Sequence, residues 1–353
     1  MQVQLWLLYL FCWCLIRKSM KNNYNSRNSK TLILKILAVV FSVIFLYAAA
    51  SYGISVIEKN TAASKKGDAS AFGETLNYNN KEYVLKDNLE TYLFLGLDKF
   101  DGEEIESYNN DKQADFLLLA VVDNETSSFT ALHINRDTVT EMNILGVAGD
   151  KIGTVEKQIA LAHTYGNGKE VSCRNTATSV SKLLGGVKIN HYVSVTMDAV
   201  PIYNDRVGGV EVTVLDDFTG VDDTLVKGEK VTLSGQHALN YVRTRYGLDD
   251  STNNNRMERQ RQYMKALYEK TKQCVEDDKK FIENSFMRLS EYIVSDCSAN
   301  RLETLMNKLS SYEFVDIYNF EGETVKGKEF MEFYPNEESV KEIAVKLFYE
   351  LKD

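Results

Sequence analysis

Cysteine is scarce in this chain, and its distribution excludes a fold held together by disulfides. The sequence contains 5 cysteines in 353 residues, and Cys12 and Cys14 lie in a short apolar stretch near the N-terminus. The other three, Cys173, Cys274 and Cys297, are an odd number, so they cannot all pair within one chain. A disulfide framework is therefore not predicted, although a single bond between Cys274 and Cys297 stays open.

Several sequence signatures of catalysis are also missing. The 4 histidines show no spacing typical of metal ligands, so we expect structural roles for them: His133, His163, His191 and His237. No serine or cysteine occupies a nucleophile elbow, and Gly208-Gly209 lacks the context of a phosphate-binding loop. Any chemistry must therefore be carried by other residue types.

Acidic residues are absent before Glu58, whereas six basic residues lie there: Arg17, Lys18, Lys21, Arg27, Lys30 and Lys35. Removing these six from the 41 basic residues leaves 35 against 50 acidic ones, a net charge of about −15 for the rest of the chain. Nucleic-acid binding depends largely on cationic contacts to phosphates. We therefore predict no nucleic-acid partner.

Residues 36–57 form an uncharged, mostly apolar run that supplies the roughly 20 residues needed to cross a bilayer. The basic residues before it predict a cytoplasmic N-terminus (residues 1–30) and an extracellular body. Residues 31–57 are therefore predicted to be an uncleaved transmembrane signal anchor. The apolar stretch 3–16 is too short to span comfortably, so we interpret Met20 as the true start; a short re-entrant segment is the alternative.

The pattern after the anchor predicts one α/β domain over residues 83–353, preceded by a small, polar juxtamembrane linker at residues 58–82. Apolar or alternating runs predict strands at residues 91–97, 116–122, 128–134, 191–196, 210–215 and 314–320. Helices are predicted at residues 154–165, 172–184, 198–206, 234–241 (capped by Ser234), 256–272 and 337–351. We expect a single mixed, partly antiparallel sheet flanked by helices.

Charged and polar residues near the ends of these elements are the strongest candidates for binding chemistry: Arg136, Asp137, Arg243, Arg245, Arg256 and Gln260. Guanidinium groups are planar and offer forked donors that suit phosphate oxygens. Each block alone has an ordinary explanation, such as a surface ion pair, helix-dipole compensation or a solvated helix face. Together they indicate a pyrophosphate clamp, and we interpret the neighbouring Arg259 and Arg261 as a solvated face.

An ordered series of segments carries a family resemblance: GLD at 96–98, ADFLLLAVVD at 114–123, LHINRDT at 132–138, NHYVSVTMDAV at 190–200, RVGGVEV at 206–212, LSGQHALNYVRTR at 233–245 and RMERQ at 256–260. In this order and spacing the chain resembles the LytR–CpsA–Psr family of bacterial cell-envelope proteins. The resemblance covers about residues 90–350. Three positions depart from the family pattern: Asn135 replaces the usual Pro, Ala114-Asp115-Phe116 replaces Ser-Asp-Thr, and Lys99 stands where Arg is frequent.

The resemblance implies an enzyme that transfers a phospho-linked glycopolymer, such as teichoic acid or a capsular glycan, in cell wall assembly. Its donor would be a polyprenyl-pyrophosphate lipid and its acceptor a peptidoglycan hydroxyl, on the outer face of the membrane of a Gram-positive type of bacterium. The lipid tail demands an apolar cavity, which we expect strands 91–97 and 116–122 and neighbouring helices to line.

The resemblance also assigns roles to individual residues. The pyrophosphate is expected to bind Arg136, Arg243, Arg245 and Arg256, with Gln260 as a neutral partner. Mg²⁺ is expected at Asp115 and Asp98, because Mg²⁺ favours a few carboxylates together with phosphate oxygens. The catalytic residues would be Asp115, Arg136 and Asp137, and the general base could be Asp115, Asp98 or Asp137.

The sequence is also consistent with three other functional hypotheses. A polyprenyl-pyrophosphate phosphatase would need the same charges, with water as the acceptor. A membrane-anchored transcriptional regulator is disfavoured by the predicted external placement and the negative charge of the body. A wall-binding module without turnover would not require Asp115.

Overall fold

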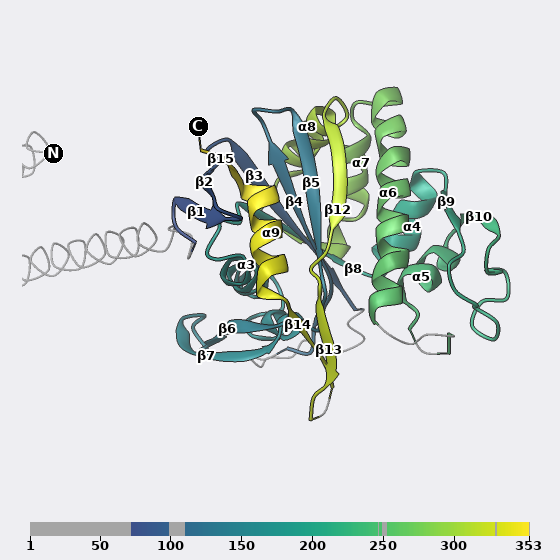
Figure 1. Ribbon diagram of the computed structural model, residues 1–353. Helices are drawn as coiled ribbons and strands as arrows, with labels where there is room; N and C mark the ends of the chain where they lie inside the picture. The colour runs from purple at the N-terminus through teal and green to yellow at the C-terminus, as the bar shows by residue number, and fades with distance from the viewer. Residues whose placement is uncertain (1–71, 99–109, 246, 249–252, 329, 353) are drawn as a thin grey trace, which may run out of the picture. The chain divides into compact units, whose positions relative to one another are not determined.

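The structure is a computed structural model that describes residues 72–98, 110–245, 247–248, 253–328 and 330–352 (Figure 1). The predicted cytoplasmic segment and signal anchor lie outside the described residues, as does Lys99. Within the described ranges, no helix is both long enough and apolar enough to cross a membrane.

A mixed sheet of six strands lies at the centre of the described domain (Figure 1). In spatial order the strands are β11 (Ile293–Ser295), β8 (His191–Thr196), β3 (Leu89–Leu97), β4 (Ala114–Asp123), β5 (Ser128–Ile134) and β12 (Glu313–Tyr318). β3–β4, β4–β5 and β8–β11 are antiparallel pairs, whereas β3–β8 and β5–β12 are parallel. The predicted α/β fold with a mixed, partly antiparallel sheet flanked by helices is confirmed, but the prediction of a single sheet is wrong, because the strand predicted at 210–215 pairs with β10 (Lys230–Leu233) outside the central sheet.

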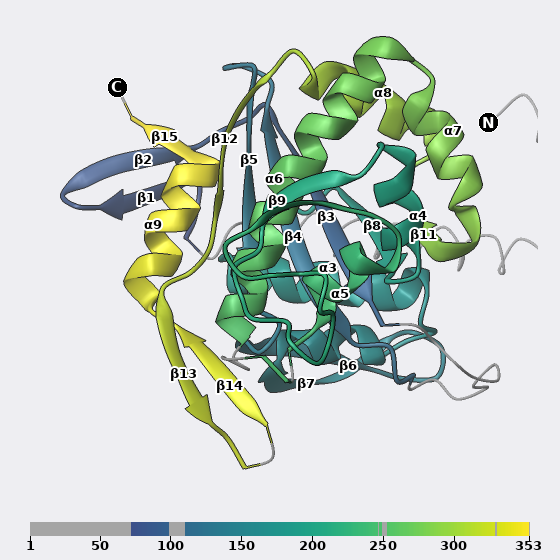
Figure 2. The same cartoon turned by 90° about the vertical axis from the view of Figure 1, so that its right-hand side faces the viewer.

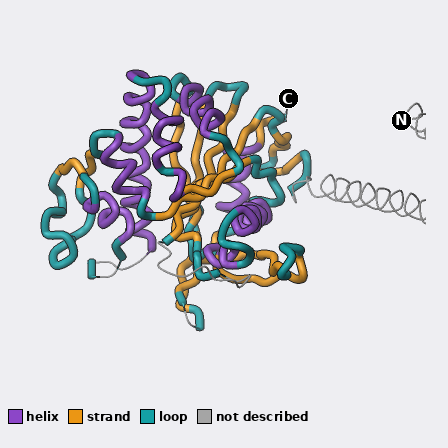
Figure 3. The backbone as a smooth tube through the Cα atoms, turned by 180° about the vertical axis from the view of Figure 1, so that it is seen from behind, coloured by secondary structure: helices purple, strands orange, loops and turns teal. Residues whose placement is uncertain are grey.

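Helices cover both faces of this sheet (Figure 3). On one face Leu93, Leu95, Leu117 and Leu119 are buried in a core shared with α3 (Glu170–Leu183) and α9 (Glu337–Phe348). Burying one such leucine is worth about 1.5–3 kcal/mol. The alternate side chains of β3 and β4 point to the other face. The helices on that side are α4 (Ala199–Arg206), α6 (Asn253–Asp277), α7 (Phe281–Arg288) and α8 (Ala299–Leu309).

Smaller sheets of two or three strands surround the central sheet. A three-stranded sheet of β1 (Thr75–Tyr78), β2 (Lys81–Leu85) and β15 (Tyr349–Leu351) joins the two ends of the domain (Figure 2). The two-stranded pairs are β6 (Val139–Leu145) with β7 (Lys151–Gln158), β9 (Val210–Thr213) with β10 (Lys230–Leu233), and β13 (Gly322–Lys326) with β14 (Met331–Pro335). Two short elements, η1 (Ile159–Thr164) and η2 (Ser290–Tyr292), are 3₁₀ helices.

Some predicted element boundaries are wrong. Strand β1 lies within the stretch 58–82 that was predicted to be a linker, and β2 begins there. The helix predicted at 154–165 is instead the end of β7 followed by η1, since β7 pairs along its length with β6. The final helix ends at Phe348 because the next three residues pair with β2. Helix α5 (Gln236–Arg243) is preceded by Gly235 as its cap residue rather than by Ser234.

The described cysteines carry no disulfide. Cys173, Cys274 and Cys297 are all free thiols, so the bond that the sequence left open between Cys274 and Cys297 is not formed. Burial raises the pKa of Cys173 to about 12, which keeps this side chain an unreactive thiol at neutral pH.

Candidate functional site

The predicted site residues follow strand ends on one side of the central sheet. Asp98 directly follows β3, and Asp115 is the second residue of the antiparallel β4. Arg136 and Asp137 follow β5, which pairs with β4 on its other side. Antiparallel pairing therefore brings together the end of β3, the start of β4 and the end of β5.

Arg136 lies between two buried carboxylates. Its Nη1 forms an ion pair with Oδ1 of Asp115, and its Nε lies 3.5 Å from Oδ1 of Asp137. Its Nη2 donates a hydrogen bond to Oε1 of Gln113. Asp115 and Asp137 are only 9% and 5% exposed. The guanidinium of Arg136 is thus held in one orientation next to two potential proton acceptors.

Asp137 is surrounded by positive charge. Burial raises its pKa, and the nearby guanidiniums of Arg136, Arg245 and Arg256 oppose this shift without cancelling it. Burial, together with repulsion from Arg136 and Arg245, also lowers the pKa of Arg256 to about 10. Three guanidiniums against the carboxylates of Asp115 and Asp137 leave an excess of positive charge in a partly buried place. An anion such as a phosphate would relieve this imbalance.

Arg243 belongs to a second, more open pair. Its Nε lies 3.1 Å from Oδ1 of Asp98, and the two side chains are 50% and 46% exposed. The predicted pyrophosphate clamp is therefore divided into a partly buried group of Arg136, Arg245 and Arg256 and a more exposed pair of Arg243 and Asp98.

Asn135, which stands where the family usually has proline, ties this turn to α6. Its Oδ1 accepts hydrogen bonds from the backbone N–H of Asp137, at 2.9 Å, and from Nδ2 of Asn253, at 2.6 Å. Oδ1 of Asn253 in turn accepts a hydrogen bond of 2.5 Å from Nη2 of Arg256. A side-chain network thus holds the Arg136-Asp137 turn where proline would restrict the backbone.

Arg259 corrects an expectation, because it is fully buried and not part of a solvated face. Its Nε lies 2.7 Å from Oδ2 of Asp216, and its two terminal nitrogens donate to the backbone carbonyls of Tyr241 and Thr244. These carbonyls close the end of α5, from which Arg243 and Arg245 extend. Arg259 therefore positions the segment that carries two of the clamp arginines, and no sequence signal distinguished it from Arg261.

Gln260 lies one helical turn after Arg256 and supports the same segment. Its Nε2 donates to the backbone carbonyl of Val242 at 3.0 Å, while its Oε1 is buried and accepts no hydrogen bond from the described residues. Gln260 also lines an apolar cavity, so it lies between the arginines and that cavity.

The apolar cavity has a volume of about 400 Å³ and lies between the central sheet and the helices on its α6 side. β3 and β4 contribute to its walls, as the sequence predicted, and the helices contribute side chains such as Met264 and Leu302. A Cβ added to Gly96 would lie 2.9 Å from Cβ of Phe116 and 3.3 Å from Cε of Met197. The glycine therefore keeps space open where β3 approaches the arginines.

A bulkier side chain in the wall should test whether the cavity binds a lipid tail. Ala120 lines the cavity beside Tyr92 and Ala131 on the neighbouring strands. Ala120→Phe is expected to exclude two or three CH₂ groups of a polyprenyl chain, worth about 0.8 kcal/mol each, and to weaken donor binding about 10- to 50-fold. The check is donor affinity by equilibrium binding, with inorganic pyrophosphate as the control ligand that should bind unchanged. Equal donor affinity in both proteins would place the tail elsewhere.

A second, polar pocket of about 270 Å³ adjoins the arginines on the β5 and β12 side. Asn135, Arg261 and Asn319 line it together with the aromatic ring of Phe333. His133, also in its lining, is buried with its ring tilted against that of Phe116, and burial with nearby Arg261 and Arg256 lowers its pKa to about 3. His133 is therefore neutral at physiological pH, and the amide and guanidinium groups supply most of the polar lining.

Asp222 fixes the loop between β9 and β10 to helix α5. Its carboxylate accepts hydrogen bonds from Oγ1 of Thr224 (2.6 Å) and Nδ2 of Asn240 (2.9 Å), and lies 2.7 Å from Nδ1 of His237. Burial raises the pKa of Asp222, but these three partners outweigh it and bring the pKa down to about 2.

We expect this aspartate to stabilise the fold at neutral pH and to lose that effect in acid. The lowered pKa stabilises the folded state above the unfolded value near 3.8, and the contribution, about 2 kcal/mol, is lost as the pH falls through about 2. Asp222→Asn should therefore melt earlier than wild type at neutral pH and approach it in acid, as measured by thermal unfolding. The exposed neighbour Asp223 offers a control, since Asp223→Asn should keep the wild-type pH profile. Parallel pH profiles for Asp222→Asn and wild type would disprove the assignment.

The site thus combines a group of guanidiniums with an apolar cavity, whose lining residue Gln260 lies one helical turn from Arg256. The chain belongs to the LytR_cpsA_psr family, whose family model matches residues 49–348. The resemblance seen in the sequence is thereby confirmed.

Individual relatives agree with this membership. The chain is 29% identical over 240 residues to the polyisoprenyl-teichoic acid–peptidoglycan teichoic acid transferase TagU of Enterococcus faecalis, covering 67% of this chain and 71% of that protein. The TagU of Bacillus cereus strain ATCC 14579 is 30% identical over 53% of this chain, and the chain spans 54% of its length. Among solved structures, B. subtilis TagV superposes with a TM-score of 0.56 at 24% identity, covering 74% of this chain and 97% of that one. A structure titled TagT bound to LIIa-WTA gives 0.55 at 20% identity, covering 74% and 90%.

Proposed function

We propose that this protein transfers a phospho-linked glycopolymer from a polyprenyl-pyrophosphate lipid to a hydroxyl of peptidoglycan. The observation that carries the proposal is the position of Gln260, which lines the apolar cavity one helical turn from the buried Arg256. A lipid tail in the cavity would place its diphosphate among Arg136, Arg245 and Arg256. The names of the relatives support a glycopolymer of the teichoic acid kind.

In the proposed reaction, the acceptor hydroxyl oxygen attacks the phosphorus nearer the glycan. The bond from this phosphorus to the bridging oxygen breaks, and polyprenyl monophosphate leaves with the electron pair. The arginines neutralise negative charge that develops on the leaving phosphate. The acceptor proton passes to a carboxylate. The candidates are Asp115 and Asp137, which both pair with Arg136 beside the expected position of the diphosphate. The raised pKa of Asp137 suits a group that holds a proton, whereas Asp115 is paired directly with the clamp.

Mg²⁺ fits the donor atoms of this site. Oδ1 of Asp98 and Oδ1 of Asp115 are shielded from solvent and accept no hydrogen bond from the described residues, although each pairs with an arginine. Hard carboxylate oxygens next to a diphosphate suit Mg²⁺, which prefers oxygen ligands. We assign Asp115 and Asp98 as the residues that would hold the ion, which when bound supplies further positive charge to the diphosphate. With a phosphate bound, Arg136 and Arg243 would turn from these aspartates to the ligand.

The polar pocket beside Asn135 would face the sugar end of the reaction. Its amide, guanidinium and aromatic groups are the types that bind sugar hydroxyls and ring faces. We further propose that the predicted signal anchor, residues 31–57, holds the domain on the outer side of the membrane, where donor and acceptor meet.

The proposal is tested with the full chain in detergent, a polyprenyl-pyrophosphate oligosaccharide labelled in the glycan, a peptidoglycan oligomer and Mg²⁺. Wild type should join label to peptidoglycan, and Arg136→Ala should lose this joining. Release of labelled glycan without joining would instead identify a phosphatase. Donor binding without any turnover would leave a binding module, and the transferase proposal would be wrong in either case.

A further inference from the structure

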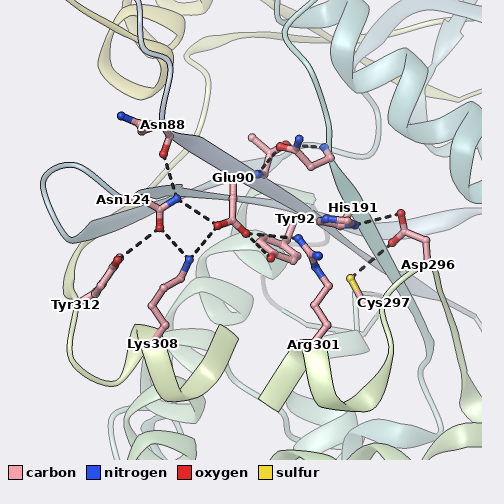
Figure 4. Close-up of polar contacts among 12 residues, drawn as sticks. Asn88, Glu90, Tyr92, Asn124, His191, Asp296, Cys297, Arg301, Lys308 and Tyr312 are labelled. Carbon is pink, nitrogen blue, oxygen red and sulfur yellow. Dashed lines mark hydrogen bonds and ion pairs between the residues drawn. The ribbon is translucent and has the colours of Figure 1, made fainter. Parts of the chain in front are cut away.

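Three potential metal ligands, His191, Asp296 and Cys297, lie together at the end of β8 opposite to the arginines (Figure 4). His191 is the first residue of β8, and the other two directly follow β11. β11 runs antiparallel to β8, so its end meets the start of β8. The sequence could not reveal this group, because His191 lies 105 positions before Asp296.

The donor atoms lie close to the spacing that a small metal ion requires. Nδ1 of His191 lies 3.3 Å from Oδ2 of Asp296, and Sγ of Cys297 lies 3.7 Å from Oδ1 of Asp296. All three donor atoms lie within 4.8 Å of one another. Tetrahedral zinc, with bonds of about 2.0–2.3 Å, places its donor atoms about 3.3–3.8 Å apart. Small side-chain rotations would therefore close the group around one ion.

Surrounding contacts hold two of these ligands in place. The backbone N–H of Tyr192 donates to Oδ1 of Asp296 at 3.0 Å. Oγ of Ser295 donates to the carbonyl of Tyr192 at 2.8 Å and accepts from the backbone N–H of Cys297 at 2.9 Å. Contacts of this kind orient the ligands of natural metal sites.

The ring of His191 is oriented by Tyr92, whose ring centroid lies 5.1 Å away. Tyr92 is itself held by a hydrogen bond to Glu90, which also pairs with Lys308 and Arg301 of α8 (Figure 4). Glu90 therefore holds Tyr92 in place and pairs with both of these cations.

The group is accessible to solvent, and its donor atoms suit a transition metal ion. Cys297 is 5% exposed, whereas the side chains of His191 and Asp296 are 20% and 34% exposed. An ion could therefore enter from solvent and keep a water as its fourth ligand. Thiolate and imidazole donors favour Zn²⁺ and its neighbours over Mg²⁺.

We propose that His191, Asp296 and Cys297 bind one divalent transition metal ion of the Zn²⁺ type. Binding displaces the thiol proton of Cys297 to solvent and forms a metal–sulfur bond. The ion links the start of β8 to the segment that leads into α8, a helix whose Leu302, Leu305 and Met306 line the apolar cavity. It thereby stabilises one wall of that cavity, and the proposal does not depend on the transferase reaction.

The test uses the full chain, stripped of metal with a chelator and titrated with Co²⁺. Wild type should show a thiolate-to-Co²⁺ charge-transfer band that saturates at one ion per chain and is abolished by Zn²⁺. Zn²⁺ should raise the melting temperature by on the order of 5 °C when it is in hundredfold excess over Kd. Cys297→Ser and His191→Asn should lose both effects.

Two further variants separate ligation from general damage. Cys274→Ser removes a free cysteine outside the group and should keep the band and the temperature shift. Asp296→Asn keeps an oxygen for the N–H of Tyr192, so it should weaken Co²⁺ binding without lowering the metal-free melting temperature. A wild-type protein without the band, or a Cys297→Ser protein that retains it, would overturn the proposal.

Discussion

Arg256→Ala is expected to lower kcat for glycopolymer transfer by about 10²–10³, the usual cost of removing one group that stabilises transition-state charge. Arg256 is 6% exposed and lies against Arg136, Arg245 and Asp137. Alanine at this position therefore leaves a cavity between these side chains and removes one positive charge from the diphosphate site. Arg256→Lys keeps a charge but not the planar fork, and it should recover only part of the rate. The measurement is the initial rate of labelled glycan joining.

A matched control lies on the same helix. Lys265 of α6 pairs with Asp316 at 2.7 Å on an exposed surface and does not belong to the arginine group. Lys265→Ala should therefore transfer at close to the wild-type rate. Equal losses of transfer rate in Arg256→Ala and Lys265→Ala would mean that the rate depends on an intact α6 and not on the guanidinium of Arg256.

Asp115→Asn is expected to lower the transfer rate by about 10²–10⁴, the range for the loss of a positioned proton acceptor. The amide is nearly isosteric, but it cannot take a proton, and it removes the ion pair that holds Arg136. Donor affinity should change far less than kcat, because the arginines that bind the diphosphate remain. Both quantities can be measured on one preparation, by single-turnover transfer and by equilibrium binding.

The far end of the same strand supplies the control. Asp123 is also buried and ion-paired, with Lys86 at 2.8 Å, and it terminates β4 away from the arginines. Asp123→Asn should lower stability without lowering kcat. An Asp115→Asn protein that transfers as fast as Asp123→Asn would remove Asp115 from the reaction.

Much of the central sheet could be predicted from the sequence, because its strands have distinctive apolar patterns. β8 was predicted with the bounds that the structure has, and the apolar runs of β3 and β4 are strong signals of buried strands. β7 was missed because Val155, Ile159 and Ala162 happen to follow helical spacing. Its pairing with β6 is a non-local contact that overrides this local pattern.

The candidate site was predicted as a set of charges but not as an arrangement. The strand end before it signalled Arg136, whereas Asp98 and Asp115 were assigned from the family resemblance; antiparallel pairing brings the three positions together. Arg256 and Arg259 are alike in sequence, yet one faces Asp137 and the other satisfies buried carbonyls of α5. The packing of α6 against α5 decides between those two roles. This packing cannot be inferred from the spacing of residues in a single sequence.

The most direct measurement follows the phosphorus nearer the glycan in a radiolabelled polyprenyl-pyrophosphate donor. The account predicts that this atom passes into peptidoglycan, with one unlabelled polyprenyl monophosphate released for each label joined, and that Arg136→Ala abolishes both products together. Label that stays with the lipid, or appears as a soluble phosphate while no peptidoglycan is labelled, would contradict it.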